Sequence, residues 1–69
     1  DKFDLIFLDP PFKYKKINKL IIDIKKLELI KKNGLIILHR HKNDKEILCE
    51  EFKIIRKKSY GISNIFFGN

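Results

Sequence analysis

The chain has 69 residues and a formal net charge of +7. A domain of this length buries only about 60% of the surface that its unfolded chain exposes, so we expect one small domain or part of a larger one. A single cysteine, Cys49, excludes an internal disulfide and is typical of a reducing cytoplasm. No apolar run approaches the roughly 20 residues that cross a bilayer, so the sequence indicates a soluble, cytoplasmic protein with no membrane partner. Methionine is absent even at position 1, which indicates a piece of a longer protein.

The first predicted element is a strand over residues 3–8 (FDLIFL). This run is almost wholly apolar and rich in strand formers, a pattern typical of a strand buried on both faces of a parallel sheet. Proline cannot donate a hydrogen bond to a sheet and holds its predecessor extended. We therefore expect Asp9, Pro10 and Pro11 to lie at the carboxyl end of this strand.

An amphipathic helix is predicted over residues 15–26. Its apolar residues recur at helical spacing, with charged residues mostly on the opposite side. The apolar stripe consists of Ile17, Leu20, Ile21, Ile24 and Leu27. Residues 31–34 (KKNG) are expected to end the unit, with the glycine as a left-handed cap. Residues 35–38 (LIIL) predict a second strand, and the strand, helix, strand order predicts parallel pairing.

The rest of the chain predicts a polar loop at residues 39–44, a helical turn at 45–50 and a hairpin. The hairpin strands are expected at residues 52–59 and 62–67, joined at Tyr60 and Gly61, because glycine allows a positive φ. The core residues expected here are Phe52, Phe66 and Phe67. The predicted fold class is α/β, in the order β-α-β-β-β, with a parallel first pair and a C-terminal antiparallel hairpin.

The strongest functional signal is the run Asp9, Pro10, Pro11 and Phe12 directly after the first strand. In open parallel sheets, ligands bind outside the carboxyl ends of the strands. An exocyclic amine on a nucleic-acid base is a poor nucleophile, because its lone pair is delocalised into the ring. The Asp9 carboxylate and the Pro10 carbonyl can accept hydrogen bonds from its two N–H groups and direct the lone pair at an activated methyl group.

Phe12 can stack on the target base, an interaction worth about 1–3 kcal/mol. The competing interpretation of the motif is a proline-stiffened strand exit with Phe12 in the core. The position of the motif after an apolar strand favours the functional interpretation.

The segment FDLIFLDPPF resembles the fourth motif of Rossmann-like aminomethyltransferases. With LIKKNGLIILHRHK next and FKIIRKKSYGISNIFF at the end, the layout is similar to the bacterial family of small-subunit ribosomal RNA guanine-N2 methyltransferases. The resemblance implies part of a Rossmann-like sheet, S-adenosylmethionine as methyl donor and a guanine N2 amine in ribosomal RNA or the small ribosomal subunit as target. It implies catalytic roles for Asp9, Pro10, Pro11 and Phe12, and contacts with the donor for Asp9 and Pro10.

In that family, a glycine-rich turn and an acidic residue hold the donor, and neither has a counterpart in this sequence. Residues 1–69 are therefore expected to be the C-terminal half of one methyltransferase domain. We expect activity from the intact enzyme, as a monomer, and not from these residues alone.

Six basic residues are candidates for contacts with RNA phosphates or base edges. They are Lys13, Lys15, Lys16, Arg40, His41 and Lys42. A charged helix start and a solvated loop explain them equally well, and the lysine-rich composition also fits an AT-rich genome. His39 and His41 lack a third ligand at suitable spacing, so no metal site is predicted.

Two other functions fit the sequence. An adenine-N6 DNA methyltransferase or a glutamine-amide methyltransferase would share the motif, although the latter usually has asparagine at the position of Asp9. A non-catalytic basic module that binds nucleic acid would explain the charge without any chemistry.

Overall fold

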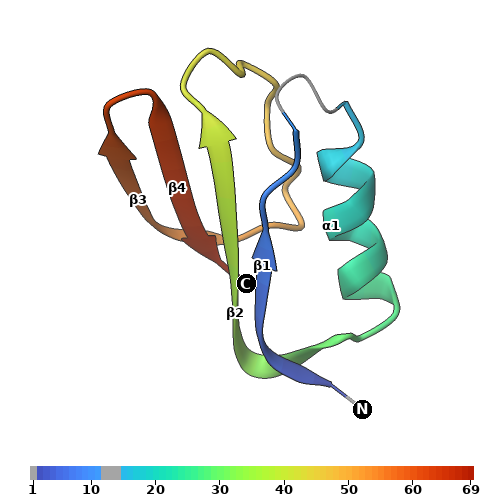
Figure 1. Cartoon of the computed structure of the whole chain (residues 1–69). Helices are drawn as coiled ribbons and strands as arrows, with labels where there is room; N and C mark the ends of the chain where they lie inside the picture. Colours follow the sequence, from blue (N-terminus) through green and yellow to red (C-terminus); the bar gives the residue numbers. More distant parts are fainter. Residues whose placement is uncertain (1, 12–14) are drawn as a thin grey trace.

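The computed structural model describes residues 2–11 and 15–69 (Figure 1). The elements are β1 (Phe3–Leu8), α1 (Ile17–Lys26), β2 (Ile30–His41), β3 (Ile54–Tyr60) and β4 (Ser63–Gly68). The strands form one sheet in the order β1-β2-β4-β3. β1 and β2 are parallel, whereas β4 is antiparallel to both β2 and β3. The predicted fold class is confirmed.

Helix α1 lies against one face of the sheet (Figure 1). Its buried residues, Ile17, Ile21 and Ile24, belong to the predicted apolar stripe. They form the core together with Ile36 and Leu38 of β2, which have no exposed surface. Side chains alternate along a strand, so the even-numbered residues at this end of β2 face the helix.

The helix ends earlier than its apolar stripe. Leu27 is exposed, and Glu28 has a φ of 52°, so the left-handed residue is Glu28 and not the glycine at the end of residues 31–34. A residue in the left-handed region stops the helical hydrogen-bond pattern and turns the chain. The chain then returns to the sheet within two residues and enters β2.

The prediction that β1 is buried on both faces is wrong. Ile6 and Leu8 pack against the core, whereas Phe3, Leu5 and Phe7 are 55–60% exposed. Because side chains alternate along a strand, these three residues project from the face opposite to α1. Helix α1 covers only one face of β1. The apolar side chains on the other face of this strand are therefore exposed in this structure.

Strand β2 is longer at both ends than predicted. Phe3 pairs with Ile30 and Leu5 pairs with Leu35. Between these two pairs the chain advances by two residues in β1 but by five residues in β2. Residues 31–34 therefore form an irregularity inside the strand and not a turn before it. Gly34 is needed here for close approach, because a Cβ atom would lie 3.1 Å from the Asp4 carbonyl oxygen. At the other end, β2 continues to His41, so the polar loop starts three residues later than expected.

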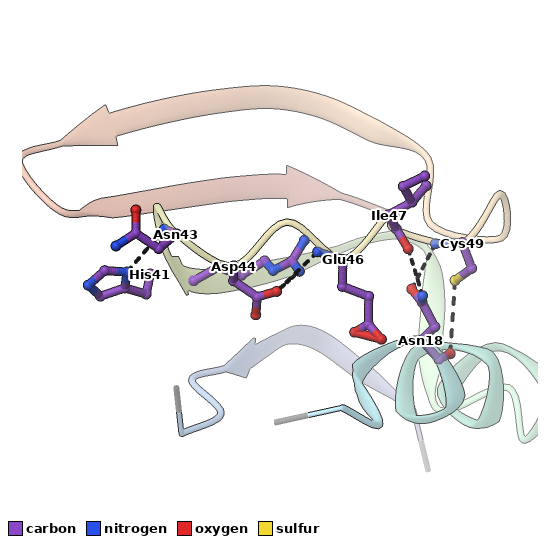
Figure 2. A network of polar contacts seen from close by, with 8 residues as sticks. Asn18, His41, Asn43, Asp44, Glu46, Ile47 and Cys49 are labelled. Atoms are coloured by element: carbon purple, nitrogen blue, oxygen red, sulfur yellow. Dashed lines mark hydrogen bonds and ion pairs between the residues drawn. The ribbon is translucent and has the colours of Figure 1, made fainter. Parts of the chain in front are cut away.

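The connection between β2 and β3 contains no helical turn at residues 45–50. The side chain of Asn18 in α1 holds this segment through two hydrogen bonds, and its carbonyl accepts a third from Cys49 Sγ, as Figure 2 shows. Its side-chain Nδ2 donates to the Ile47 carbonyl at 2.7 Å, and its Oδ1 accepts from the Cys49 N–H at 2.8 Å. Backbone groups that a helix would pair locally are instead bonded to a distant side chain. The cysteine is half-buried and packs against the core.

The C-terminal hairpin turns at Gly61, which has a φ of 52°, as predicted. Phe52 is buried but precedes β3, whereas Phe66 and Phe67 are half-buried. The cations of β3 are mostly exposed at the sheet edge, and the Lys57 ammonium lies 5.5 Å from the centre of the Phe66 ring. Among residues 2–11 and 15–69, no helix has the length and apolar content needed to cross a membrane.

Replacement of Gly34 by alanine should destabilise the protein more than replacement of Gly61. At Gly34, the new Cβ would lie 2.5 Å from Ile30 Cγ1 and 3.0 Å from the Lys31 carbonyl oxygen, and such crowding costs about 2 kcal/mol. At Gly61, no atom of the described residues other than its chain neighbours lies within 4 Å of the new Cβ, and only the left-handed backbone opposes a side chain, at about 1 kcal/mol. Denaturant unfolding of both variants of the intact protein measures the difference. The opposite ranking would contradict the close approach at Gly34.

Candidate active site

The carboxyl ends of β1 and β2 lie at the same rim of the sheet. Leu8 pairs with Leu38, so the next residues, Asp9 and His39, are neighbours beyond the end of β1. Both side chains project from the face opposite to α1, because they follow residues that pack on the core side. The third strand at this rim is β4, whose first residue, Ser63, pairs with His41.

Three side chains from these strands form a hydrogen-bonded chain. His39 Nδ1 lies 2.7 Å from Asp9 Oδ1, and His39 Nε2 lies 2.8 Å from Ser63 Oγ. The Asp9 side chain is 57% exposed and that of His39 is 34% exposed. The chain therefore runs from a half-buried hydroxyl to a carboxylate that is open to solvent.

The hydrogen-bond partners determine which His39 nitrogen carries the proton. An ionised carboxylate only accepts hydrogen bonds, so Nδ1 must donate to Asp9. In the neutral ring, Nε2 is then the acceptor, and the Ser63 hydroxyl donates to it. All three groups are satisfied in this one arrangement.

A pocket of about 230 Å³ opens beside this chain. It is lined by the strand exit, the end of β2 and the start of the hairpin's second strand. The lining residues are Asp9, Pro10, Pro11, His39, Arg40, His41, Asp44, Ile62 and Ser63. Asp9, Pro10 and Pro11 of the predicted motif and the end of the neighbouring strand thus line the same opening.

A buried ion pair supports one side of the pocket. The Arg40 side chain is 5% exposed and its Nη2 donates to Asp44 Oδ1 at 2.6 Å. Burial alone would raise the pKa of Asp44. The hydrogen bonds from Arg40 and from the Glu46 N–H, together with the charges of Arg40 and Lys15, outweigh burial and lower this pKa below its ordinary value.

The structure places the predicted catalytic residues as follows. Asp9, Pro10 and Pro11 line the pocket. Phe12 lies outside the described residues, as does Lys13, so their predicted roles in stacking and RNA contact stay predictions.

The other five basic residues differ in their exposure. Lys15, Lys16 and Lys42 are exposed, and His41 is half-buried at the pocket wall. The Arg40 side chain is buried and forms an ion pair with Asp44. In this structure its guanidinium therefore orders the loop after β2 and does not face solvent. The sequence pattern does not distinguish Arg40 from its neighbours, because it predicts that the second strand ends at Leu38 and leaves Arg40 in a loop.

Sequence reasoning missed two members of the hydrogen-bonded chain. In the sequence alone, His39 suggests only a possible metal ligand, and Ser63 suggests only a position in a hairpin strand. A β2 strand that continues to His41 places His39, through the alternation of strand faces, on the same side as Asp9. Among the residues that the structure describes, no group of three or more possible ligands could hold a metal ion.

Comparison with known proteins identifies relatives of the chain. Residues 1–69 match the family model described as Conserved hypothetical protein 95. The chain is 33% identical over 63 residues to the uncharacterised methylase RP545 of Rickettsia prowazekii, an alignment that covers 91% of this chain and 27% of that protein.

Solved structures show the same arrangement. A Haemophilus influenzae protein, HI0767, proposed to be a methylase, matches 96% of this chain with a TM-score of 0.76 and 29% identity. A conserved hypothetical protein of Streptococcus pyogenes matches 99% with a TM-score of 0.81 and 29% identity. The Escherichia coli protein yhhF, a proposed methyltransferase, has a TM-score of 0.76 over 97% of the chain at 16% identity, which shows the fold alone.

The chain spans less than half of the length of each of these relatives. It covers 27% of the Rickettsia protein, and 41%, 44% and 37% of the three solved chains. The shared region is a parallel strand pair joined by a helix, followed by an antiparallel hairpin, which is part of a Rossmann-like sheet.

Substitution of Asp44 by asparagine should destabilise the protein in a pH-dependent way. The pKa of Asp44 is lower in the folded protein than its ordinary value of 3.8, so its ionised form stabilises the fold above that pH. This stabilisation is lost as the pH falls through the folded-state pKa. We expect a loss of about 2 kcal/mol in the free energy of unfolding at neutral pH, and a smaller difference below about pH 4.

Urea unfolding of the intact protein at several pH values measures this difference. Asp23→Asn is the matched control, because Asp23 pairs with Lys19 on the exposed side of α1. A pH-independent difference between wild type and Asp44→Asn would exclude the proposed linkage.

Proposed function

We propose, because the chain belongs to the Conserved hypothetical protein 95 family, that the intact protein is a methyltransferase acting on the exocyclic amine of a nucleic-acid base. The observation that carries this proposal is the position of the Asp9 carboxylate. It is exposed at the rim of a parallel strand pair, beside Pro10 and Pro11, in a pocket that the end of β2 also lines. A methyl acceptor with N–H bonds matches an open, acceptor-only group.

The chain's own residues supply positioning. The Asp9 carboxylate and the Pro10 carbonyl accept hydrogen bonds from the two N–H groups of the amine. These hydrogen bonds favour a tetrahedral nitrogen with its lone pair directed away from the ring. Proline fixes the backbone of this turn, so little motion is lost on binding. After transfer, the surplus proton leaves to Asp9 or to water, and a strong base is unnecessary.

S-adenosylmethionine is the methyl donor that we propose, and it supplies an electrophilic methyl group when bound. The described pocket, at about 230 Å³, is smaller than the roughly 300–1,000 Å³ typical of complete ligand sites. Its carboxylate and carbonyl groups suit the amine and the cationic end of the donor. Asp9 and Pro10 are therefore the residues that we assign to donor contact, while the remainder of the donor requires other parts of the intact protein.

The proposed substrate is a guanine N2 amine in small-subunit ribosomal RNA. This assignment comes from the resemblance of the motif and layout, and the net charge of +7 supports a polyanionic substrate. Lys15, Lys16 and Lys42 are exposed, and His41 lines the pocket, so these residues are the candidates for RNA contact. Residues 1–69 would form the C-terminal half of the methyltransferase domain.

Asp9→Ala should lower methyl transfer by the intact protein by at least about a hundredfold, because one of the two acceptors that orient the amine is lost. The measurement is transfer of labelled methyl from S-adenosylmethionine to unmethylated small-subunit RNA, with nucleoside mass spectrometry of the product.

Asp23→Ala is the control, because it removes an exposed carboxylate that does not line the pocket, and it should retain wild-type activity. Undiminished activity of Asp9→Ala would remove Asp9 from the mechanism. A methylated adenine in DNA as the product would support the adenine-N6 alternative over guanine N2.

A further inference from the structure

The Asp9 carboxylate has two oxygens, and the structure distinguishes them. Among the residues that the structure describes, its hydrogen-bond partner is His39, which bonds Oδ1 at 2.7 Å. The side chain is 57% exposed, so Oδ2 can be approached from the pocket. One oxygen is therefore held by the protein and the other is left for a ligand.

We propose that His39 is a positioning residue for Asp9, a role that rests on the proposed methyl transfer. His39 Nδ1 donates to Oδ1 and fixes the rotation of the carboxylate, so that Oδ2 meets the substrate amine in a constant orientation. His39 does not touch the substrate in this role. It acts through Asp9.

The imidazole can serve as such a support because both of its nitrogens are bonded. Ser63 Oγ holds Nε2 at 2.8 Å, and rotation of the ring would break the hydrogen bonds at both ends. Asp9 follows β1, His39 lies in β2 and Ser63 begins β4, so the three groups are anchored to three adjacent strands. A site held by strands is positioned more accurately than one held by loops.

The order of carboxylate, imidazole and hydroxyl also occurs in serine hydrolases, where the carboxylate is buried and the hydroxyl faces the substrate. Here the exposure runs in the opposite direction. The bond between His39 and Ser63 is partly buried, whereas the bond between His39 and Asp9 is exposed. The group presented to a substrate is therefore the carboxylate of Asp9.

The pair of Asp9 and His39 contributes little to stability. A single hydrogen bond adds about 1 kcal/mol net, and this one is exposed, with the two side chains 57% and 34% exposed. Substitutions of His39 should therefore leave the fold intact, and their effects on catalysis can be interpreted directly.

Two substitutions separate the functions of the two ring nitrogens. In His39→Asn, the amide nitrogen takes the place of Nδ1 and still donates to Asp9. In His39→Gln, the longer amide reaches the position of Nε2 near Ser63 and loses the hydrogen bond to Asp9. We expect His39→Asn to retain most of the wild-type kcat and His39→Gln to lose about tenfold to a hundredfold, with KM for RNA nearly unchanged in both.

Nitrogen NMR of the His39 ring in the intact protein gives a readout that does not require activity. We expect the tautomer with its proton on Nδ1 in the wild type, and a shift towards the tautomer protonated on Nε2 in Asp9→Ala. Identical ring spectra in both proteins would overturn the proposal.

The kinetic outcomes distinguish this proposal from the one on which it rests. An active wild type with equal kcat for His39→Asn and His39→Gln overturns the role of His39 and leaves the methyltransferase assignment in place. A wild type that transfers no methyl to RNA or DNA overturns the assignment, and the role of His39 with it.

Discussion

Leu8 of β1 lies opposite Leu38 of β2, and this pairing determines which side chains meet beyond the ends of the two strands. Parallel strands present their carboxyl ends at one rim, so Asp9 and His39 become neighbours although 30 residues separate them. A register shift of one residue would turn His39 towards α1 and away from the carboxylate. The crossover helix therefore contributes to the site indirectly, because its burial of Ile21 against Ile36 and Leu38 holds the register.

The two faces of β2 divide structural and chemical roles. On the helix side, the strand ends with Arg40, which is buried and neutralised by Asp44, so even a charged residue there serves the fold. On the other side, His39 and His41 are half-buried and line the pocket. Alternation along a single strand thus directs the arginine that orders the loop after β2 to one face and the two histidines to the other, and residues from both faces line the pocket.

The sequence predicted the features that depend on local signals. The first strand, its end at Asp9 and the turn at Gly61 were placed correctly, because an apolar run, two prolines and a glycine each act on the backbone around them. The errors arose where distant contacts decide. Residues 31–34 join β2 because β1 accepts them as an irregularity, and the site residue His39 depends on where that strand ends. The burial of β1 on one face depends on which elements pack against each face of the sheet. The pattern of apolar residues within a strand of six residues cannot predict this.

Asn18 joins α1 to the connection between β2 and β3, and this has a consequence for how the molecule opens. The Cys49 N–H is held by the Asn18 side chain, 31 residues away, and not by a neighbour in a regular element. Its hydrogen can exchange with solvent only when the connection separates from the helix. Slow exchange at this one amide would therefore show that helix and connection open as a single cooperative unit, whereas fast exchange would show that the connection opens alone.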